Sequence, residues 1–187
     1  ATNTGGSATA TISITVNDAP PSGVAYSGSP FTLTKGVAMT TATPSVSGGT
    51  VTSWSVSPSL PAGLSLDTST GAISGTPTAI TSVANYTVTA TNGGGSNSTV
   101  VSIVVNDVAP SSITYTPSSL SLTKDVTMSA ITPTSSGGAV TSWSISATLP
   151  AGLSFDTSTG TISGTPTAIS SSTSYTVTAS NTGGSAT

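Results

Sequence analysis

The side chains that could do chemistry in this sequence are few and far apart. All five acidic residues are Asp, both basic residues are Lys, and Arg, Glu, His and Cys are absent. Ser and Thr make up about 40 % of the chain, but a hydroxyl becomes a nucleophile only beside a base. No residue pattern indicates a cofactor. The composition therefore argues against an enzyme.

Two of the acids, Asp67 and Asp156, stand at the start of the same five-residue stretch, Asp-Thr-Ser-Thr-Gly. An Asp at this place can accept hydrogen bonds from backbone NH groups two residues further on, and Gly71 and Gly160 supply the positive φ of a tight connection. We interpret the stretch as a capped hairpin turn. A metal ligand is the alternative reading of each carboxylate.

These turns belong to an internal repeat of 89 residues. Residues 54–78 read WSVSPSLPAGLSLDTSTGAISGTPT, and residues 143–167 read WSISATLPAGLSFDTSTGTISGTPT. A repeat of this length predicts two small domains that gain stability by stacking on neighbours. The net charge of −3, without a basic cluster, argues against nucleic acid and anionic membranes as partners, and no apolar run is long enough to span a membrane.

Short stretches with period-two alternation, separated by Gly, Pro and Asn, predict strands throughout and no helix. We expect strands in the first repeat near 24–27, 31–34, 44–47, 50–57, 64–67, 71–75, 84–91 and 98–106. Seven or eight such strands predict an antiparallel β-sandwich of immunoglobulin-like type. Pro-containing linkers at 19–22 and 108–111 are expected to be stiff and to string the domains in line.

The alternation also predicts the inward-facing side chains, with Trp54, Tyr86, Trp143 and Tyr175 as the core anchors. The other inward positions of the first repeat are Tyr26, Leu33, Val56, Leu64, Leu66, Ile73, Val88, Ala90, Val101 and Ile103, and those of the second include Tyr115, Leu122, Ile145, Phe155, Ile162 and Val177.

The motif LPAGLS(L/F)DTSTGxISGTPT, followed by YTVTAxNxGGS and a closing xVSIxVND, resembles the bacterial putative immunoglobulin domain family, which is related to cadherin-like domains of dystroglycan type. The resemblance covers essentially the whole chain. It implies tandem arrays in large secreted or surface-anchored proteins with a spacer, adhesive or structural role, and it brings no catalytic motif.

The sequence begins within a repeat, because its first residues match the end of a repeat unit and not its start. Residues 1–9 match residues 179–187, and residues 8–18, a predicted half-buried strand with Ile12, Ile14 and Val16 on one face, match 97–107. We therefore expect residues 1–18 to be the closing strand of a preceding repeat or a donor strand. Residues 19–107 form one complete domain, and residues 108–187 form a domain without its last strand.

An open sandwich has unpaired backbone groups and an exposed core groove. The chain's own first strand cannot fill the groove, because the groove lies at least one domain length away and a four-residue linker spans only about 14 Å. The partner is thus expected to be a copy of the same chain or an adjacent repeat of the same polypeptide. Two histories fit: a discrete subunit that polymerises by strand donation, or a window of a longer covalent array.

Several weaker patterns have plain structural explanations. The linkers VNDAP and VNDVAP resemble the end of a cadherin calcium linker but offer few carboxylates. Lys35 and Lys124 are read as solvated turn residues, with isopeptide bonds as the alternative. Asn85 and Asn97 begin glycosylation sequons, so a glycan coat is possible. Rows of outward Thr reflect strand propensity, with ice or carbohydrate binding as the alternative.

We expect a structural repeat of an extracellular filament or cell-surface stalk. The alternative is an adhesin repeat that binds glycan or another surface ligand. Exposed aromatic residues or loop acids that differ between the repeats would favour the adhesin, and the sequence offers no such cluster.

Overall fold

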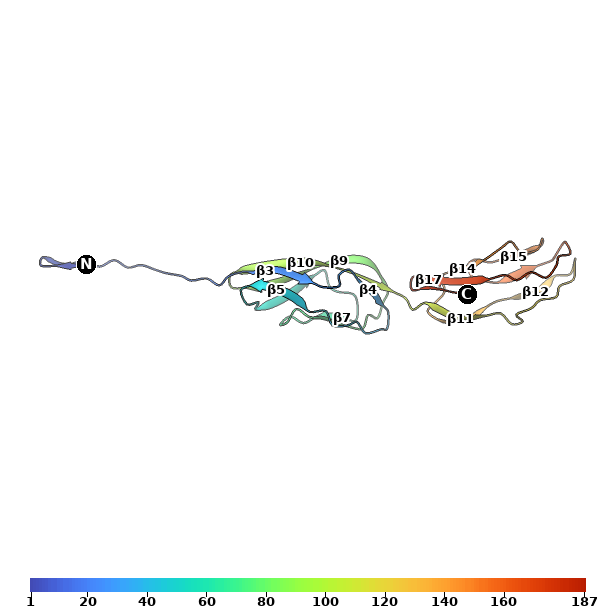
Figure 1. The fold of residues 1–187 in the computed structure, drawn as a ribbon, viewed down its shortest axis with the longest axis horizontal. Helices are drawn as coiled ribbons and strands as arrows, with labels where there is room; N and C mark the ends of the chain where they lie inside the picture. Colours follow the sequence, from blue (N-terminus) through green and yellow to red (C-terminus); the bar gives the residue numbers. More distant parts are fainter.

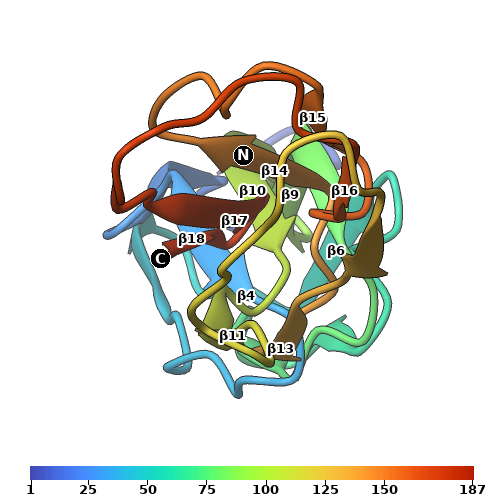
Figure 2. The same ribbon diagram turned by 90° about the vertical axis from the view of Figure 1, so that its right-hand side faces the viewer.

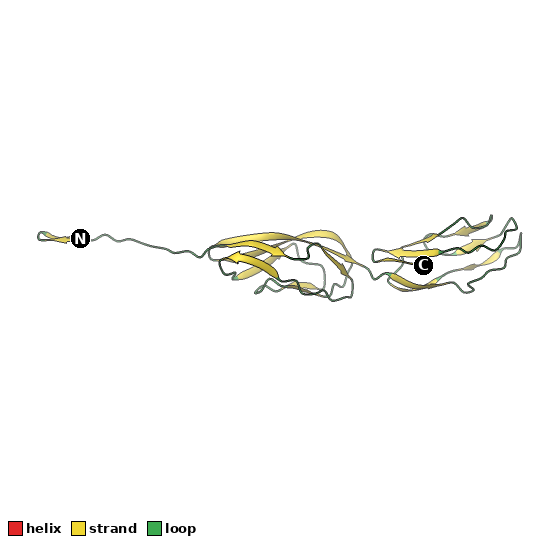
Figure 3. Ribbon diagram, in the orientation of Figure 1, coloured by secondary structure: helices red, strands yellow, loops and turns green.

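A computed structural model describes residues 1–187 as an elongated molecule with two β-domains in line and a thin N-terminal extension (Figure 1). Every regular element is a strand, as Figure 3 shows. The structure thus confirms the all-β tandem architecture. No helix is present that could cross a membrane.

The first domain holds the strands β3 (Pro21–Tyr26), β4 (Phe31–Thr34), β5 (Pro44–Gly48), β6 (Ser53–Ser57), β7 (Leu64–Leu66), β8 (Ile73–Gly75), β9 (Thr81–Asn92) and β10 (Gly95–Asn106). They form one four-stranded sheet in the order β4-β10-β9-β6, together with the pairs β3-β5 and β7-β8. The core lies between these layers, where the inward faces of β6, β9 and β10 meet Val24, Tyr26 and Ile73.

All twelve predicted inward side chains of this domain are buried or packed against the core. Val24, Ala42 and Val105 belong to the core as well. One pairing departs from the antiparallel expectation, because β4 runs parallel to β10, with Ile103 opposite Phe31 and Val105 opposite Leu33. The strand β3 pairs with β5, whereas β4 lies at the edge of the four-stranded sheet beside β10. The turn between β3 and β4 therefore carries the chain to the edge strand that pairs with the closing strand.

The second domain holds β11 (Pro110–Thr114), β12 (Met128–Ile131), β13 (Thr134–Gly137), β14 (Ser142–Ile145), β15 (Leu153–Phe155), β16 (Ile162–Gly164), β17 (Val177–Asn181) and β18 (Gly184–Ala186). Its sheets are β14-β17-β18, β12-β16-β15 and β11-β13. The end-on view shows β14 and β17 on one side of the domain and β11 and β13 on the other (Figure 2).

The N-terminal extension begins with a small hairpin of β1 (Thr2–Asn3) and β2 (Gly6–Ser7). Residues 8–20 follow with no strand pairing, and the extension leads away from the first domain along the long axis (Figure 1), except that Asp18 and Ala19 bond to Asn92 of that domain. The pairing predicted for residues 8–18 is with another copy or an adjacent repeat, and within the single chain these residues are unpaired. The physical reason is that no sheet edge lies within reach of this segment.

Candidate strand-acceptor groove

The first domain shows how a closing strand is held in this fold. Along β10, Val101 and Ile103 are 0 % exposed and Val105 is 1 % exposed. The strand lies between two partners, pairing antiparallel with β9 and parallel with β4. Burying three branched side chains on one strand contributes several kcal/mol, at about 1.5–3 kcal/mol each. The second half of β10 is thus a central part of the core.

In the second domain the same place is a groove of about 620 Å³ between the two layers. The strand β18 ends at Ala186, and the counterpart of residues 99–106 would lie beyond Thr187. Apolar side chains from both layers line the groove: Tyr115, Leu120, Leu122, Leu153, Ile169 and Tyr175. The groove thus lies where the second half of β10 lies in the first domain, and part of its lining is apolar.

The elements that flank the groove contain less strand structure than their counterparts in the first domain. Residues 120–123 correspond to β4 but form no strand. The strand β17 begins at Val177, whereas its counterpart β9 begins at Thr81, which corresponds to residue 170. Both stretches lack the ladder partner that β10 supplies in the first domain. Their backbone groups therefore remain open to an incoming strand.

Leu122 was predicted to point inward, but it is 38 % exposed and Leu120 is 40 % exposed. Leu122 lines the groove but stays partly exposed there, because no strand covers it as β10 covers its counterpart Leu33. The sequence analysis did not single out Leu120. The alternation of Leu120 with Leu122 is the signal that could have revealed it.

The segment that matches the closing strand lies at the other end of the molecule. Ile12 and Ile14 are each 78 % exposed and Val16 is 91 % exposed. At the repeat distance of 89 residues they correspond to Val101, Ile103 and Val105 of β10. The first domain separates this segment from the groove, and the segment points away from it (Figure 1). The structure does not bring these predicted residues together with the groove of the same chain.

The four core anchors lie at equivalent positions of the two domains. Trp54, Tyr86 and Trp143 are buried, whereas Tyr175 is half-buried and lines the groove. The difference between Tyr86 and Tyr175 has a local cause, because Val101 stands directly opposite Tyr86 on β10. Tyr175 has no such neighbour.

The Asp-Thr-Ser-Thr-Gly turns have the same hydrogen-bonded cap in both domains. Asp67 Oδ1 accepts hydrogen bonds from Ser69 Oγ at 2.6 Å, Ser69 N at 2.8 Å and Thr70 N at 3.1 Å. These bonds, that of the Ser69 hydroxyl first, lower the pKa of Asp67 to about 2. The pKa of Asp156 is lowered in the same way, chiefly by Ser158. Both carboxylates act as turn caps here.

Each turn is also tied to the tryptophan of its own domain. The NH of Trp54 donates to the carbonyl of Thr68 at 2.9 Å, and the NH of Trp143 donates to that of Thr157 at 2.8 Å. Gly71, at φ 75°, lies so close to the indole of Trp54 that a Cβ there would be 2.6 Å from Cδ2. The turn thus requires glycine for two reasons, its conformation and its contact with the ring.

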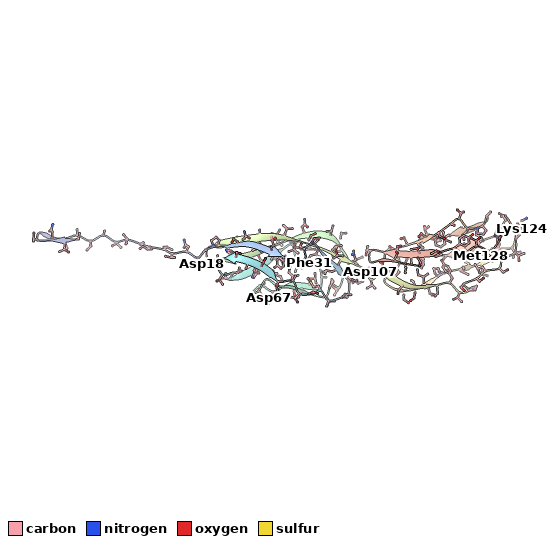
Figure 4. All side chains as sticks on the ribbon, viewed as in Figure 1. Asp18, Phe31, Asp67, Asp107, Lys124 and Met128 are labelled. Atoms are coloured by element: carbon pink, nitrogen blue, oxygen red, sulfur yellow. The ribbon has the colours of Figure 1, made fainter.

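The remaining candidate sites are dispersed, as Figure 4 shows for the labelled acids and Lys124. No three His, Cys, Asp or Glu side chains gather where they could hold a metal. Lys124 pairs only with its neighbour Asp125, at 3.3 Å on the surface. Asn85 is exposed on β9, whereas Asn97 is half-buried and its Oδ1 accepts from Val24 N at 3.2 Å. Asn85 is therefore the more accessible of the two sequons.

Comparison with known proteins supports the fold. A family model described as "Putative Ig domain" matches residues 13–106 and 109–187. Among solved structures, the extracellular domains 3–5 of Drosophila OTK align with a TM-score of 0.50 and 16 % identity, covering 88 % of this chain and 59 % of that one. The titin domains Z1Z2 in complex with telethonin align with a TM-score of 0.42 and 16 % identity, covering 92 % and 94 %. Comparison with curated protein sequences finds no significant match.

Proposed function

Because this chain belongs to the Putative Ig domain family, with two members in tandem, we propose that it is a structural repeat of an extracellular filament or cell-surface stalk. In this proposal the domains stand head to tail, and a strand of the type found at residues 10–18 completes the groove of the domain before it. The observation that carries the proposal is the match between this exposed segment and the buried second half of β10.

The repeat distance defines the register of the proposed pairing. In the first domain Ile103 lies opposite Phe31 and Val105 opposite Leu33. The corresponding pairs in the completed second domain are Ile14 with Leu120 and Val16 with Leu122. On the antiparallel side, Val101 opposite Tyr86 becomes Ile12 opposite Tyr175. Three exposed side chains would fill a groove lined by exposed or half-buried ones, which supplies the hydrophobic gain of association.

The same frame places Ala10 directly after Thr187, because residues 1–9 repeat residues 179–187. A strand that continues the covalent chain therefore enters the groove without competition. A strand from a separate copy brings its own β1-β2 hairpin to the place already occupied by β17-β18, so that one of the two must move aside. Completion of the groove by a separate copy therefore has a higher free-energy cost than completion by the same polypeptide.

The surface supports a structural role better than the adhesive alternative. Both Trp and the tyrosines Tyr26 and Tyr86 are buried, and the other two tyrosines line the groove. An adhesin site needs exposed aromatic or acidic groups that converge, and the acids lie apart (Figure 4). Low charge and abundant hydroxyls also permit close lateral packing.

Self-association of the 1–187 chain tests the proposed pairing between copies. Ile14→Asp places a charge where Ile103 is 0 % exposed in the completed domain, so it should abolish association measured by sedimentation velocity. Thr11→Asp is the matched control, because its counterpart Val100 is 56 % exposed. If the Ile14→Asp chain associates as the parent does, donation through this strand is ruled out.

Mass determination on native material distinguishes the two histories. A species near 17.8 kDa supports donation between separate subunits. A much longer polypeptide supports completion within one covalent array. The role itself is tested by electron microscopy of the native material, where continuous filaments are expected and dispersed single particles would contradict it.

A further inference from the structure

The linkers before the two domains are held in the same way by the domain that follows each of them. Asn92, at the tip of the β9-β10 hairpin, donates from Nδ2 to the carbonyl of Ala19 at 2.7 Å and to Asp18 Oδ2 at 3.1 Å. Asn181, at the tip of β17-β18, donates from Nδ2 to the carbonyl of Val108 at 2.7 Å. Figure 4 shows Asp18 and Asp107 at the two corresponding junctions.

Two glycines in each domain allow the linker to come this close. A Cβ on Gly94 would collide with the carbonyl oxygen of Asp18, and one on Gly49 with that of Ala19. In the second domain, Gly183 faces the carbonyl of Asp107 and Gly138 that of Val108 in the same manner. None of these four glycines has a positive φ. Glycine is therefore needed here for close approach alone.

The two ends of the asparagine side chain have separate tasks. Asn92 Oδ1 accepts from Gly94 N at 2.9 Å and Gly95 N at 3.1 Å, and Asn181 Oδ1 accepts from Gly183 N at 2.8 Å. The isolated β1-β2 hairpin has the same bond, from Gly5 N to Asn3 Oδ1 at 2.8 Å, although no linker lies against it. The oxygen thus shapes the hairpin tip, and the nitrogen donates to the linker; the Asn181 nitrogen also donates to the carbonyl of Ala139 in its own domain, at 3.1 Å.

From these contacts we infer that each hairpin tip forms a docking site together with the glycine that faces it. This site binds the linker that follows the closing strand of the preceding domain. We name this arrangement the linker clasp: Asn92, Gly94 and Gly49 in the first domain, and Asn181, Gly183 and Gly138 in the second. It fixes the orientation of each domain relative to the one before it. At the second junction Thr182 adds a bond, its Oγ1 accepting from Asp107 N at 3.0 Å.

The linker clasp joins consecutive domains more firmly than the prolines do alone. Proline fixes one backbone angle of the linker, whereas domains joined by a short linker with a small interface move relative to each other by default. The clasp holds two successive linker carbonyls against the next domain. A row of such joints would have one repeated angle, whether the closing strand comes from the same polypeptide or from another copy.

The inference is tested in the full 1–187 chain with spin labels on either side of the second junction. The chain has no cysteine, so Thr87→Cys and Ser144→Cys, both exposed on strands, provide unique attachment sites. Pulsed electron spin resonance on a dilute, monomeric sample then reports the distribution of distances between the domains. The parent is expected to show one narrow distribution.

Asn181→Asp should convert the narrow distribution into a broad one. The aspartate keeps an oxygen for the NH of Gly183, but it cannot donate to the carbonyl of Val108, which repels it, or to that of Ala139. Circular dichroism and the urea midpoint of the second domain check that the loss of the Ala139 bond leaves the domain folded. Gly183→Ala should have the same effect by collision with Asp107. The matched controls are Asn85→Asp, at an exposed position of β9, and Gly93→Ala, where a Cβ meets nothing within 4 Å.

A broad distribution in the parent, or a narrow one in Asn181→Asp, overturns the inference. If Gly183→Ala fails to fold, as judged by circular dichroism, Asn181→Asp decides the question alone. Because the sample is monomeric, the result does not depend on strand donation, and a failure of the proposed pairing would appear separately as loss of self-association.

Discussion

The substitution Ile103→Ala tests the role of the closing strand in the complete domain. Ile103 is 0 % exposed and stands between Ala84 on β9 and Phe31 on β4. Removing its outer carbons from a site with neighbours on both sides should cost about 2–5 kcal/mol of unfolding free energy. With a denaturant dependence of about 2 kcal/mol per molar urea, the middle of the usual range, the midpoint of the first domain should fall by about 1–2.5 M.

The corresponding substitution in the extension, Ile14→Ala, is the control with the same chemistry. Ile14 is 78 % exposed, so the unfolding of the first domain should not change. Urea titration followed by the fluorescence of Trp54, in a Trp143→Phe background, reports the first domain alone. A cost below about 1 kcal/mol for Ile103→Ala, where core truncations ordinarily cost more, would refute the assignment, as would equal costs at the two positions.

Three further predictions concern the turn and the core of the first domain. Gly71→Ala should lower the unfolding free energy by at least about 1–2 kcal/mol because of its positive φ, and by more because of the contact with Trp54. Gly93→Ala should cause no comparable loss, and the urea midpoints of the two variants test this. Asp67, with a pKa of about 2 against about 3.9 when unfolded, contributes stability that is present above about pH 4 and lost as the pH falls toward 2. Asp67→Asn should flatten this acid limb, and an unchanged limb would contradict the turn-cap role. Burial raises the pKa of Tyr26 to about 12, against about 10 when unfolded, so its stabilising effect is present below pH 10 and lost as the pH rises toward 12. Tyrosinate absorbance of Tyr26 should therefore appear together with unfolding, and normal titration in the folded domain would contradict its burial.

The sequence predicted the parts of the fold that depend on local patterns. Period-two alternation located β9 and β10, because alternate residues are buried from Tyr86 to Asn92 in β9 and from Val101 to Val105 in β10. The Asp67 cap was predictable because its hydrogen bonds reach only two and three residues along the chain. Trp54 was placed in the core by its size and its position within an alternating strand.

Features that depend on contacts between distant residues were not predictable in this way. The parallel pairing of β4 with β10 joins residues about seventy positions apart, and no turn signal encodes it. Asn92 directly follows the predicted strand at 84–91, but nothing in the sequence near it shows that Nδ2 reaches Ala19. The alternation at residues 8–18 predicts a strand, and this stays a prediction because the single chain provides no sheet edge for it.

The measurement that tests the central claim most directly is hydrogen exchange on a chain extended after Thr187 with the sequence of residues 10–18, ATISITVND. The repeat frame places this extension in the groove of the second domain. We predict that the amides of residues 120–123 and 170–176, the counterparts of β4 and of the first part of β9, become protected. An extension in which the two Ile and the Val are replaced by Ser should give no protection. Equal exchange in both extended chains would contradict the claim that this groove accepts this strand.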